Sequence, residues 1–405
     1  VNSGIVPPID LTTYTDAAGT ATLLGVPAGA GYAIAVTKAG YSSAQTYGAT
    51  ASNTNPLPAH LGVALYQTTA ATFAIDLVSS LSIQTFELPK EVTWTDTFAD
   101  VSKIGTTTAV EIDSGNVQRE SIEGSYGTAG EVISNPLSIP FLSRWKEFTW
   151  VDSTPASTSI AYHVYDASWN LIPDVSLPGN NSGFTVSPIS LLSISTSTYS
   201  MIRVGAELMS EDSNETPLVR SWNVIYEVGA EPLGNQNFSI RGAKVIGSGA
   251  SGALIYKYDQ NLSTNALGVH QLDSIEWDLY TVSVPVSGGY NIASSCAPQP
   301  VSVAPGSTVI SRLYLTPHTT NSLLVDVRAS DGTLLSGASV RLTRGAFDTT
   351  IVADECGQTY FGSLSIGSVG SGNPYAITVT AAGYAPYTSS EINVSGTTKL
   401  SIILN

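Results

Sequence analysis

Short stretches in which apolar and polar residues alternate recur along the whole 405-residue chain, and Gly, Asn, Asp and Pro separate them. A period of two is typical of half-buried β-strands, and no stretch keeps apolar residues at helical spacing over three turns. The chain is too long for one ordinary core. We therefore predict an all-β protein of several β-sandwiches. The stretches include Tyr32–Val36, Phe73–Leu77, Ser159–Tyr165, Met201–Ala206, Trp222–Tyr226, Leu323–Val327 and Leu400–Leu404.

One of these stretches belongs to an internal repeat. The segment Tyr32–Tyr41 (YAIAVTKAGY) returns as Tyr375–Tyr384 (YAITVTAAGY), and residues 265–284 form a weaker third copy. An Asp-x-x-Gly sequence precedes the two clear copies, as Asp16–Gly19 and as Asp354–Gly357. Such a sequence predicts a turn in which glycine takes a positive φ. Each copy therefore reads as a turn, a strand, a second turn and a strand that alternates into a core.

The repeat resembles the carboxypeptidase regulatory-like family, whose fold is a seven-stranded prealbumin-type sandwich. The pattern covers residues 321–405 fully and residues 235–318 loosely. The N-terminal copy lacks the first strands, so we expect upstream residues or another chain to complete its core. The chain opens on Val1 without a signal peptide, which suggests a processed ectodomain. The resemblance implies non-catalytic modules of the kind found in secreted enzymes, adhesins and pilin-like surface subunits.

A different segment lies between the copies, at about residues 91–228, and it holds five of the six tryptophans. These are Trp94, Trp145, Trp150, Trp169 and Trp222. The segment resembles a concanavalin-like or galactose-binding-like jelly roll, which implies sugar binding on a concave face or at loop ends. Trp150 and Trp169 are the candidates for sugar stacking. The alternative, which is the commoner arrangement, is that the tryptophans fill the sandwich core.

These observations divide the chain into four domains. We predict a partial regulatory-like sandwich at 1–88, a jelly roll at 89–232, and two further regulatory-like sandwiches at 233–318 and 319–405. The fold class is all-β, with tandem β-sandwich domains in an elongated multidomain chain.

The sequence Gly247-x-Gly249-x-x-Gly252 has the spacing of a dinucleotide-binding fingerprint. Such a fingerprint requires a helix after its third glycine, because the helix N-terminus holds the pyrophosphate. Here the segment 253–258 alternates like a strand and ends at Asp259. We therefore predict a hairpin loop and no nucleotide site.

The net charge of −16 argues against a nucleic-acid partner, because such binding depends on Lys and Arg that neutralise phosphates. Charged residues make up only 12% of the chain, and Ser, Thr and Gly are abundant, as in secreted surface proteins. No run of 18 apolar residues predicts a membrane span. We expect an extracellular protein at the cell surface.

The chain has two cysteines, Cys296 and Cys356, whose spacing fits no metal site. In an exported protein we expect a disulfide between them, and two buried free thiols are the alternative. The bridge would clamp the last two sandwiches together.

Residues for catalysis and metal binding are sparse. The four histidines, His60, His163, His270 and His318, are scattered, and we expect structural roles for them. Glu207, Asp212 and Glu227 lie on or near strand ends and are the acids that a glycosidase site would draw on, but we expect structural roles for them. Calcium is the one plausible metal. Its candidate ligands are Glu211 and Asp212, and Asp166 with Asp174, with solvated acidic loops as the alternative.

The sequence thus predicts a non-catalytic, exported structural or adhesive subunit of the cell surface, pilin-like or filament-forming. Its partners would be further copies of itself or other surface subunits, and glycans are a second class of partner. The alternative is a carbohydrate-binding accessory region of a secreted enzyme.

Overall fold

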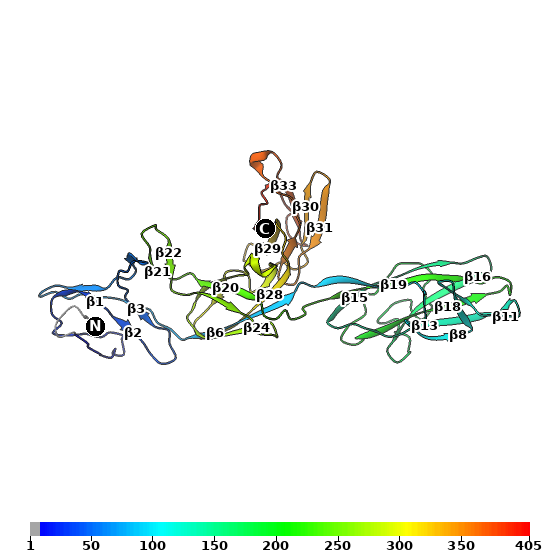
Figure 1. Ribbon diagram of the computed structural model, residues 1–405, viewed down its shortest axis with the longest axis horizontal. Helices are drawn as coiled ribbons and strands as arrows, with labels where there is room; N and C mark the ends of the chain where they lie inside the picture. The colour runs from blue at the N-terminus through cyan, green and yellow to red at the C-terminus, as the bar shows by residue number, and fades with distance from the viewer. Residues whose placement is uncertain (1–8) are drawn as a thin grey trace. The chain divides into compact units, whose positions relative to one another are not determined.

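The computed structural model describes residues 9–405 and is all-β, as the alternation predicts (Figure 1). Within these residues the only helical elements are two single 3₁₀ turns, η1 (Val286–Gly288) and η2 (Val369–Ser371). The chain forms two compact units. One contains Leu88–Glu231, and the other contains the chain up to Glu87 together with Pro232–Asn405. Our expectation about the start of the chain concerns residues 1–8, which lie outside the described residues.

The unit Leu88–Glu231 is a sandwich of two antiparallel sheets that enclose one large apolar core. In the first sheet the order is β17-β15-β19-β10-β9, and β7 also pairs with β19. In the second the order is β14-β18-β13-β8, and β16 also pairs with β18. The first sheet contains β7 (Lys90–Asp96), β9 (Val110–Asp113), β10 (Asn116–Arg119), β15 (Leu142–Ser153), β17 (Ile189–Ser190) and β19 (Leu218–Val228). The second contains β8 (Ile104–Thr108), β13 (Ala129–Ser134), β14 (Leu137–Ser138), β16 (Thr158–Asp166) and β18 (Met201–Ser210), and a hairpin of β11 (Ser121–Ile122) and β12 (Ser125–Tyr126) lies outside both sheets.

The last sandwich follows the pattern read from the repeat. A sheet of order β32-β29-β35 faces a sheet of order β31-β30-β33-β34, and both contribute to one apolar core. The first and last strands of this sandwich, β29 and β35, run parallel. Its strands are β29 (Ser322–Ala329), β30 (Ser339–Arg344), β31 (Phe347–Val352), β32 (Gln358–Phe361), β33 (Tyr375–Thr380), β34 (Tyr387–Ile392) and β35 (Thr397–Leu404).

The middle sandwich repeats this strand order with one additional strand, β26, at the edge of a sheet, but its first strand comes from far upstream. β6 runs parallel to β28 and antiparallel to β24, so it occupies the place that β29 has in the last sandwich (Figure 1). The sheet order is β24-β6-β28-β26, and the facing sheet is β23-β20-β25-β27. The strands are β6 (Ser79–Glu87), β20 (Asn237–Gly242), β23 (Asp259–Ser263), β24 (Val269–Ile275), β25 (Asp278–Ser283), β26 (Tyr290–Cys296), β27 (Val301–Val303) and β28 (Thr308–Pro317).

Residues 88–231 are therefore inserted between the first and second strands of the middle sandwich. Our division placed residues 79–88 with the N-terminal module, whereas β6 pairs within the middle sandwich. The two ends of the inserted unit lie side by side. In the pairing of β7 with β19, Lys90 lies opposite Val228 and Glu91 lies opposite Glu227. Adjacent ends let a folded unit interrupt a host without separating the host's strands.

The N-terminal segment has only short strands and shares in none of the three apolar clusters described. It contains two small antiparallel pairs, β1 with β5 and β2 with β3, and the two-residue strand β4. The strands are β1 (Gly29–Tyr32), β2 (Ala35–Val36), β3 (Ala44–Gln45), β4 (Asn55–Pro56) and β5 (Leu61–Val63). A segment without a core must be held by something outside itself.

The hairpin of β21 (Val245–Ser248) and β22 (Leu254–Tyr256) holds it, because β4 pairs with β21 in a sheet of order β22-β21-β4. We expected upstream residues or another chain to complete the core of this segment, and that stays a prediction; within the described residues the segment pairs with a hairpin of the same chain. The same hairpin contains the Gly247-x-Gly249-x-x-Gly252 sequence, and a strand follows Gly252 where a dinucleotide-binding fingerprint requires a helix. The predicted hairpin loop is confirmed.

Gly247 makes this pairing possible. Its φ is +145°, and a Cβ there would lie 2.1 Å from Asn53 Oδ1 and 2.6 Å from the Asn55 carbonyl oxygen. We expect Gly247→Val to displace β4 and to destabilise the N-terminal segment by about 1–3 kcal/mol, the usual effect of overpacking. Limited proteolysis should then cut residues 9–78 well before the rest of the chain. Ser251→Val, at the exposed hairpin tip, should leave the cleavage pattern unchanged.

Candidate functional site

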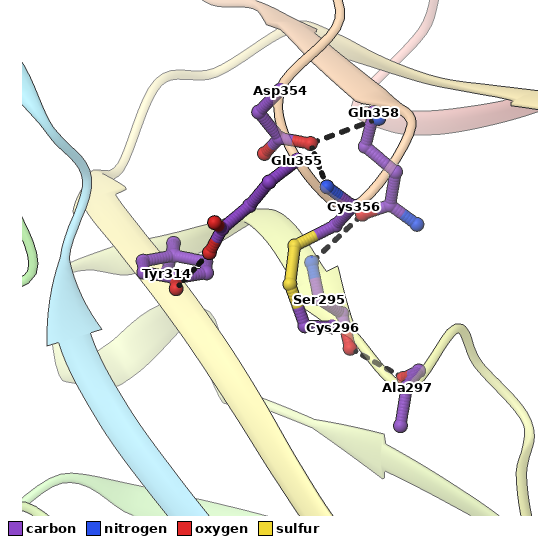
Figure 2. The surroundings of a disulfide bond; sticks show 8 residues. All are labelled: Ser295, Cys296, Ala297, Tyr314, Asp354, Glu355, Cys356 and Gln358. Carbon is purple, nitrogen blue, oxygen red and sulfur yellow. Dashed lines mark hydrogen bonds between the residues drawn. A yellow bond between two sulfur atoms is a disulfide. The ribbon is translucent and has the colours of Figure 1, made fainter. Parts of the chain in front are cut away.

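The disulfide Cys296–Cys356 joins the middle and last sandwiches (Figure 2). Cys296 ends β26, Cys356 lies in the turn between β31 and β32, and their Cα atoms are 5.0 Å apart. The turn is the predicted Asp-x-x-Gly turn: Asp354 Oδ1 accepts hydrogen bonds from the backbone N–H groups of Cys356 and Gln358 at 2.9 and 3.0 Å. Gly357 takes a φ of +67°. The predicted disulfide is confirmed.

Hydrogen bonds beside the disulfide connect the same two sandwiches. Gln358 is 5% exposed, and its Oε1 accepts a hydrogen bond of 2.7 Å from the backbone N–H of Ser295. Tyr314 in β28 donates its hydroxyl to Glu355 Oε1 at 3.2 Å (Figure 2). Buried polar groups with complete partners fix a unique packing arrangement. The disulfide therefore belongs to an ordered contact.

A second polar contact lies where the chain passes from one sandwich to the next. Asn291 is 4% exposed and donates through Nδ2 to the Tyr360 hydroxyl at 2.7 Å and to Ser322 Oγ at 3.3 Å. His318 Nδ1 donates to Asn291 Oδ1 at 2.7 Å. The structural role predicted for His318 is confirmed. We give the name junction clamp to the Cys296–Cys356 disulfide together with the hydrogen bonds of Gln358, Tyr314, Asn291 and His318.

The tryptophans of the inserted unit are mostly core residues. Trp150 is 7% exposed, and its ring stacks on Tyr162 with centroids 4.0 Å apart. Trp145 and Trp222 are completely buried. The sugar-stacking role suggested for Trp150 is therefore wrong, because both the exposed face and the space for a sugar are missing. Phe148 and Trp150 are two residues apart on β15 and point into the same core.

Trp169 has a different environment. It is 43% exposed, follows β16 in a tight turn and takes a φ of +70°, a strained value for a bulky residue. The Arg203 guanidinium lies 3.6 Å from the centroid of its ring and donates to the Ser134 carbonyl oxygen at 3.0 Å. A Cβ on Gly105 would lie 2.9 Å from both side chains, so the glycine leaves room for them. The indole is a half-exposed surface held in one orientation.

Asp166 organises the turn that carries Trp169. Its Oδ1 accepts hydrogen bonds from the backbone N–H groups of Ser168 and Asn170 at 2.7 and 2.9 Å. Burial acts to raise the pKa of the Asp166 carboxyl, but the Asn170 and Ser168 hydrogen bonds outweigh it and the pKa lies below its ordinary value. Asp166 is thus engaged as a turn residue, and Asp174 Oδ1 likewise accepts from the backbone N–H of Asn181 at 2.8 Å.

Two acids stand opposite each other on the sheet face that carries Arg203. Glu131 in β13 is the register partner of Glu207 in β18. The Tyr165 hydroxyl donates to Glu131 Oε1 at 3.0 Å, and burial, followed by the Glu131 charge, raises the pKa of Tyr165. Like charges directly opposite each other destabilise a sheet. No local pattern indicates Glu131 as a site residue, because its partner Glu207 lies on a strand much later in the chain.

The calcium candidates do not gather a ligand set. Asp212 Oδ1 accepts hydrogen bonds from the backbone and side-chain N–H groups of Asn214, each 2.9 Å long, which makes an acidic turn. Within residues 9–405, the single group of three His, Cys, Asp or Glu side chains within metal-binding reach is Cys296, Glu355 and Cys356, which is the disulfide with its neighbour. Neither Glu211 and Asp212 nor Asp166 and Asp174 belong to such a group.

The remaining histidines make local contacts through Nδ1. His60 contacts the Thr46 hydroxyl at 2.9 Å, His163 the Asn180 carbonyl oxygen at 2.7 Å, and His270 the Ser263 carbonyl oxygen at 2.7 Å.

Glu227, the remaining glycosidase candidate, is the register partner of Glu91 on β7. Within residues 9–405 no helix is long and apolar enough to cross a membrane.

Comparison with known proteins adds structural similarities at low identity. No family model matches the chain, and no curated protein matches it. The Bacillus anthracis TIE protein is 12% identical over 78% of this chain and 57% of its own, with a TM-score of 0.17. The major pilin subunit BcpA of Bacillus cereus is 10% identical over 78% of this chain and 70% of its own, and shaft pilin SpaA of Lactobacillus rhamnosus GG is 13% identical over 44% and 90%, both with a TM-score of 0.17. The chain spans 57% of the length of each of the first two structures matched, the other being a cohesin–dockerin complex from Acetivibrio cellulolyticus.

Proposed function

We propose that this protein is a non-catalytic, exported structural and adhesive subunit of the cell surface, pilin-like and filament-forming. The junction clamp is the observation that carries the proposal. A disulfide and buried side-chain hydrogen bonds connect two successive sandwiches whose strand orders differ only by the additional strand β26. A covalent and hydrogen-bonded contact of this kind resists separation of neighbouring modules under tension. This suits a subunit that transmits force along a chain of modules.

Composition supports the same proposal. The net charge of −16 favours solubility, and a disulfide persists in oxidising compartments. The partners would be further copies of this chain or other surface subunits.

Immunogold electron microscopy of source cells tests the proposal, with antibody raised against residues 319–405. We expect label at regular intervals along filaments at the cell surface. Label found only in the medium, or inside the cell, would contradict it. Pre-absorption of the antibody with the recombinant last sandwich, which should abolish the label, is the control.

A second function, as a carbohydrate-binding accessory region of a secreted enzyme, is favoured by Trp169. Its exposed indole lies on Arg203, and Arg203, Gly205 and Glu207 alternate onto the same face of β18. Sugar rings stack on aromatic faces, and carboxylates accept hydrogen bonds from hydroxyl groups.

We expect Trp169→Ala to lower the affinity for any glycan bound at this face by about tenfold, because a stacked aromatic contact is lost. Glycan-array screening followed by calorimetric titration measures the change. Val175→Ala, at a residue that is 90% exposed, is the matched control and should leave the affinity unchanged. Equal binding by both variants would exclude Trp169 from the site.

A further inference from the structure

We propose that the contact between β4 and the β21–β22 hairpin is exchangeable between copies, so that the N-terminal segment of one molecule docks on the hairpin of a second copy. This deepens the proposed assembly function and rests on it. We name the contact the clasp and define it as residues 53–57, Ser43, residues 245–248 and Lys257. The occupant of the hairpin in the assembled state is thus the equivalent segment of another copy of this chain.

The clasp is short and polar. The Ile246 carbonyl oxygen accepts hydrogen bonds from the Leu57 backbone N–H at 2.9 Å and from Asn53 Nδ2 at 3.0 Å. Lys257 Nζ donates to the Ser43 carbonyl oxygen at 2.6 Å. β4 itself pairs with β21 at only two positions. A contact with few hydrogen bonds and little apolar burial opens far more readily than a sandwich core.

The clasp is nevertheless specific. The glycine at position 247 leaves room for Asn53, whose side chain is 8% exposed, and a Cβ there would lie 2.1 Å from Asn53 Oδ1. Asn55 Nδ2 donates to Ser248 Oγ at 3.3 Å, so side chains as well as backbones are matched. A second copy presents the same hairpin and the same segment, so the segment of either copy can form these hydrogen bonds with the hairpin of the other.

The tether permits the exchange. Residues 64–76 connect the N-terminal segment to the rest of the chain without a strand, and residues 64–72 are all exposed. Exchange also requires the backbone hydrogen bonds of Ser42 with Asp76 and of Gly40 with Val78, at the end of this connection, to open. Thirteen residues can span about 45 Å when extended, which is enough to reach a neighbouring molecule. An internal contact behind a short tether is favoured in dilute solution, whereas crowded copies favour exchange. Because each molecule donates one segment and accepts one, the exchange can continue from copy to copy.

Cross-linking of mixed chains that each carry one added cysteine, beside the Cys296–Cys356 disulfide, tests the exchange. One full-length chain carries Asn55→Cys and a second, distinguishable by mass, carries Ser248→Cys. The two are mixed at high concentration, incubated and treated with a short bismaleimide. We expect covalent dimers that contain one copy of each chain. A chain that carries both substitutions should cross-link internally when dilute.

The matched control is the pair Ser80→Cys and Thr308→Cys, on β6 and β28. These side chains also touch, with Ser80 Oγ donating to Thr308 Oγ1 at 3.2 Å, but they lie on paired strands of a sandwich that shares an apolar core. Chains that carry one of these substitutions each should not cross-link. A yield of Asn55–Ser248 dimers no higher than this control would overturn the proposal, and Gly247→Val should abolish the dimers if the proposal holds.

The outcomes separate the exchange from the function on which it rests. Filaments on cells without mixed dimers would overturn the exchange and leave the surface function standing, with another joint between subunits. Mixed dimers without filaments would support the exchange and overturn the filament function.

Discussion

Replacing both cysteines, as Cys296→Ser/Cys356→Ser, should lower the free energy of unfolding of the clamped sandwiches by about 4 kcal/mol. The disulfide closes a chain segment of 60 residues, and a closed loop of this length restricts the unfolded chain by about that amount in the chain-entropy description. The double substitution avoids leaving a free thiol. Guanidinium unfolding followed by tryptophan fluorescence and circular dichroism measures the loss.

Reduction of the natural protein provides the matched control. Wild-type protein in excess reductant should unfold at the denaturant concentration of the double variant, and the variant should not respond to reductant. A loss below about 1 kcal/mol would mean that the hydrogen bonds of the junction clamp hold the sandwiches without the disulfide. That result would remove the covalent part of the argument for a force-transmitting subunit.

Local patterns were enough to predict the class of fold and the last sandwich. Alternation identifies strands such as β29 and β33, and the Asp354–Gly357 turn follows from its own four residues. The pairing of Cys296 with Cys356 also follows from there being two cysteines in the chain. In each case the determining residues are close in sequence, or there is one possible partner.

Long-range pairing could not be predicted in the same way. β6 alternates like any other strand, and nothing in residues 79–87 indicates that its partner β28 begins more than two hundred residues later. The hairpin that holds the N-terminal segment was recognised, but its partner β4 is two residues long and has no periodicity. Strand pairing depends on which edges are left open after the cores form, and that is a property of the whole fold.

The candidate site shows the same division. Phe148 and Trp150 share one face of β15, so the sequence could have indicated that Trp150 is buried. The exposure of Trp169 depends on the Asp166 turn and on Arg203 from another strand. The junction clamp combines residues of four strands and two connections, which no local motif reports.

The largest effect of a single substitution is expected for Trp222→Ala, which should lower the free energy of unfolding of the inserted unit by about 3–5 kcal/mol, as large-to-small core substitutions do. Trp222 is completely buried on β19, and its ring contacts Phe98 and Phe148 with centroids 5.0 and 6.4 Å away. Scanning calorimetry should show the transition of residues 88–231 at a lower temperature. Trp169→Ala, at a half-exposed tryptophan of the same unit, should shift it far less.

The same experiment tests whether the insertion is energetically separate from its host. The middle sandwich draws its core from β6 and from strands after residue 232, and it shares no apolar cluster with Trp222. As long as the inserted unit is folded, the midpoint temperature of the middle sandwich in the Trp222→Ala variant should therefore stay within a few degrees of the wild-type value. Above the transition of that unit, its ends are no longer held together by β7 and β19, and the host must close a long flexible loop. If the substitution instead lowers the midpoint temperature of the middle sandwich by as much as that of the inserted unit, the two unfold as one cooperative body and their separate cores are not energetically independent.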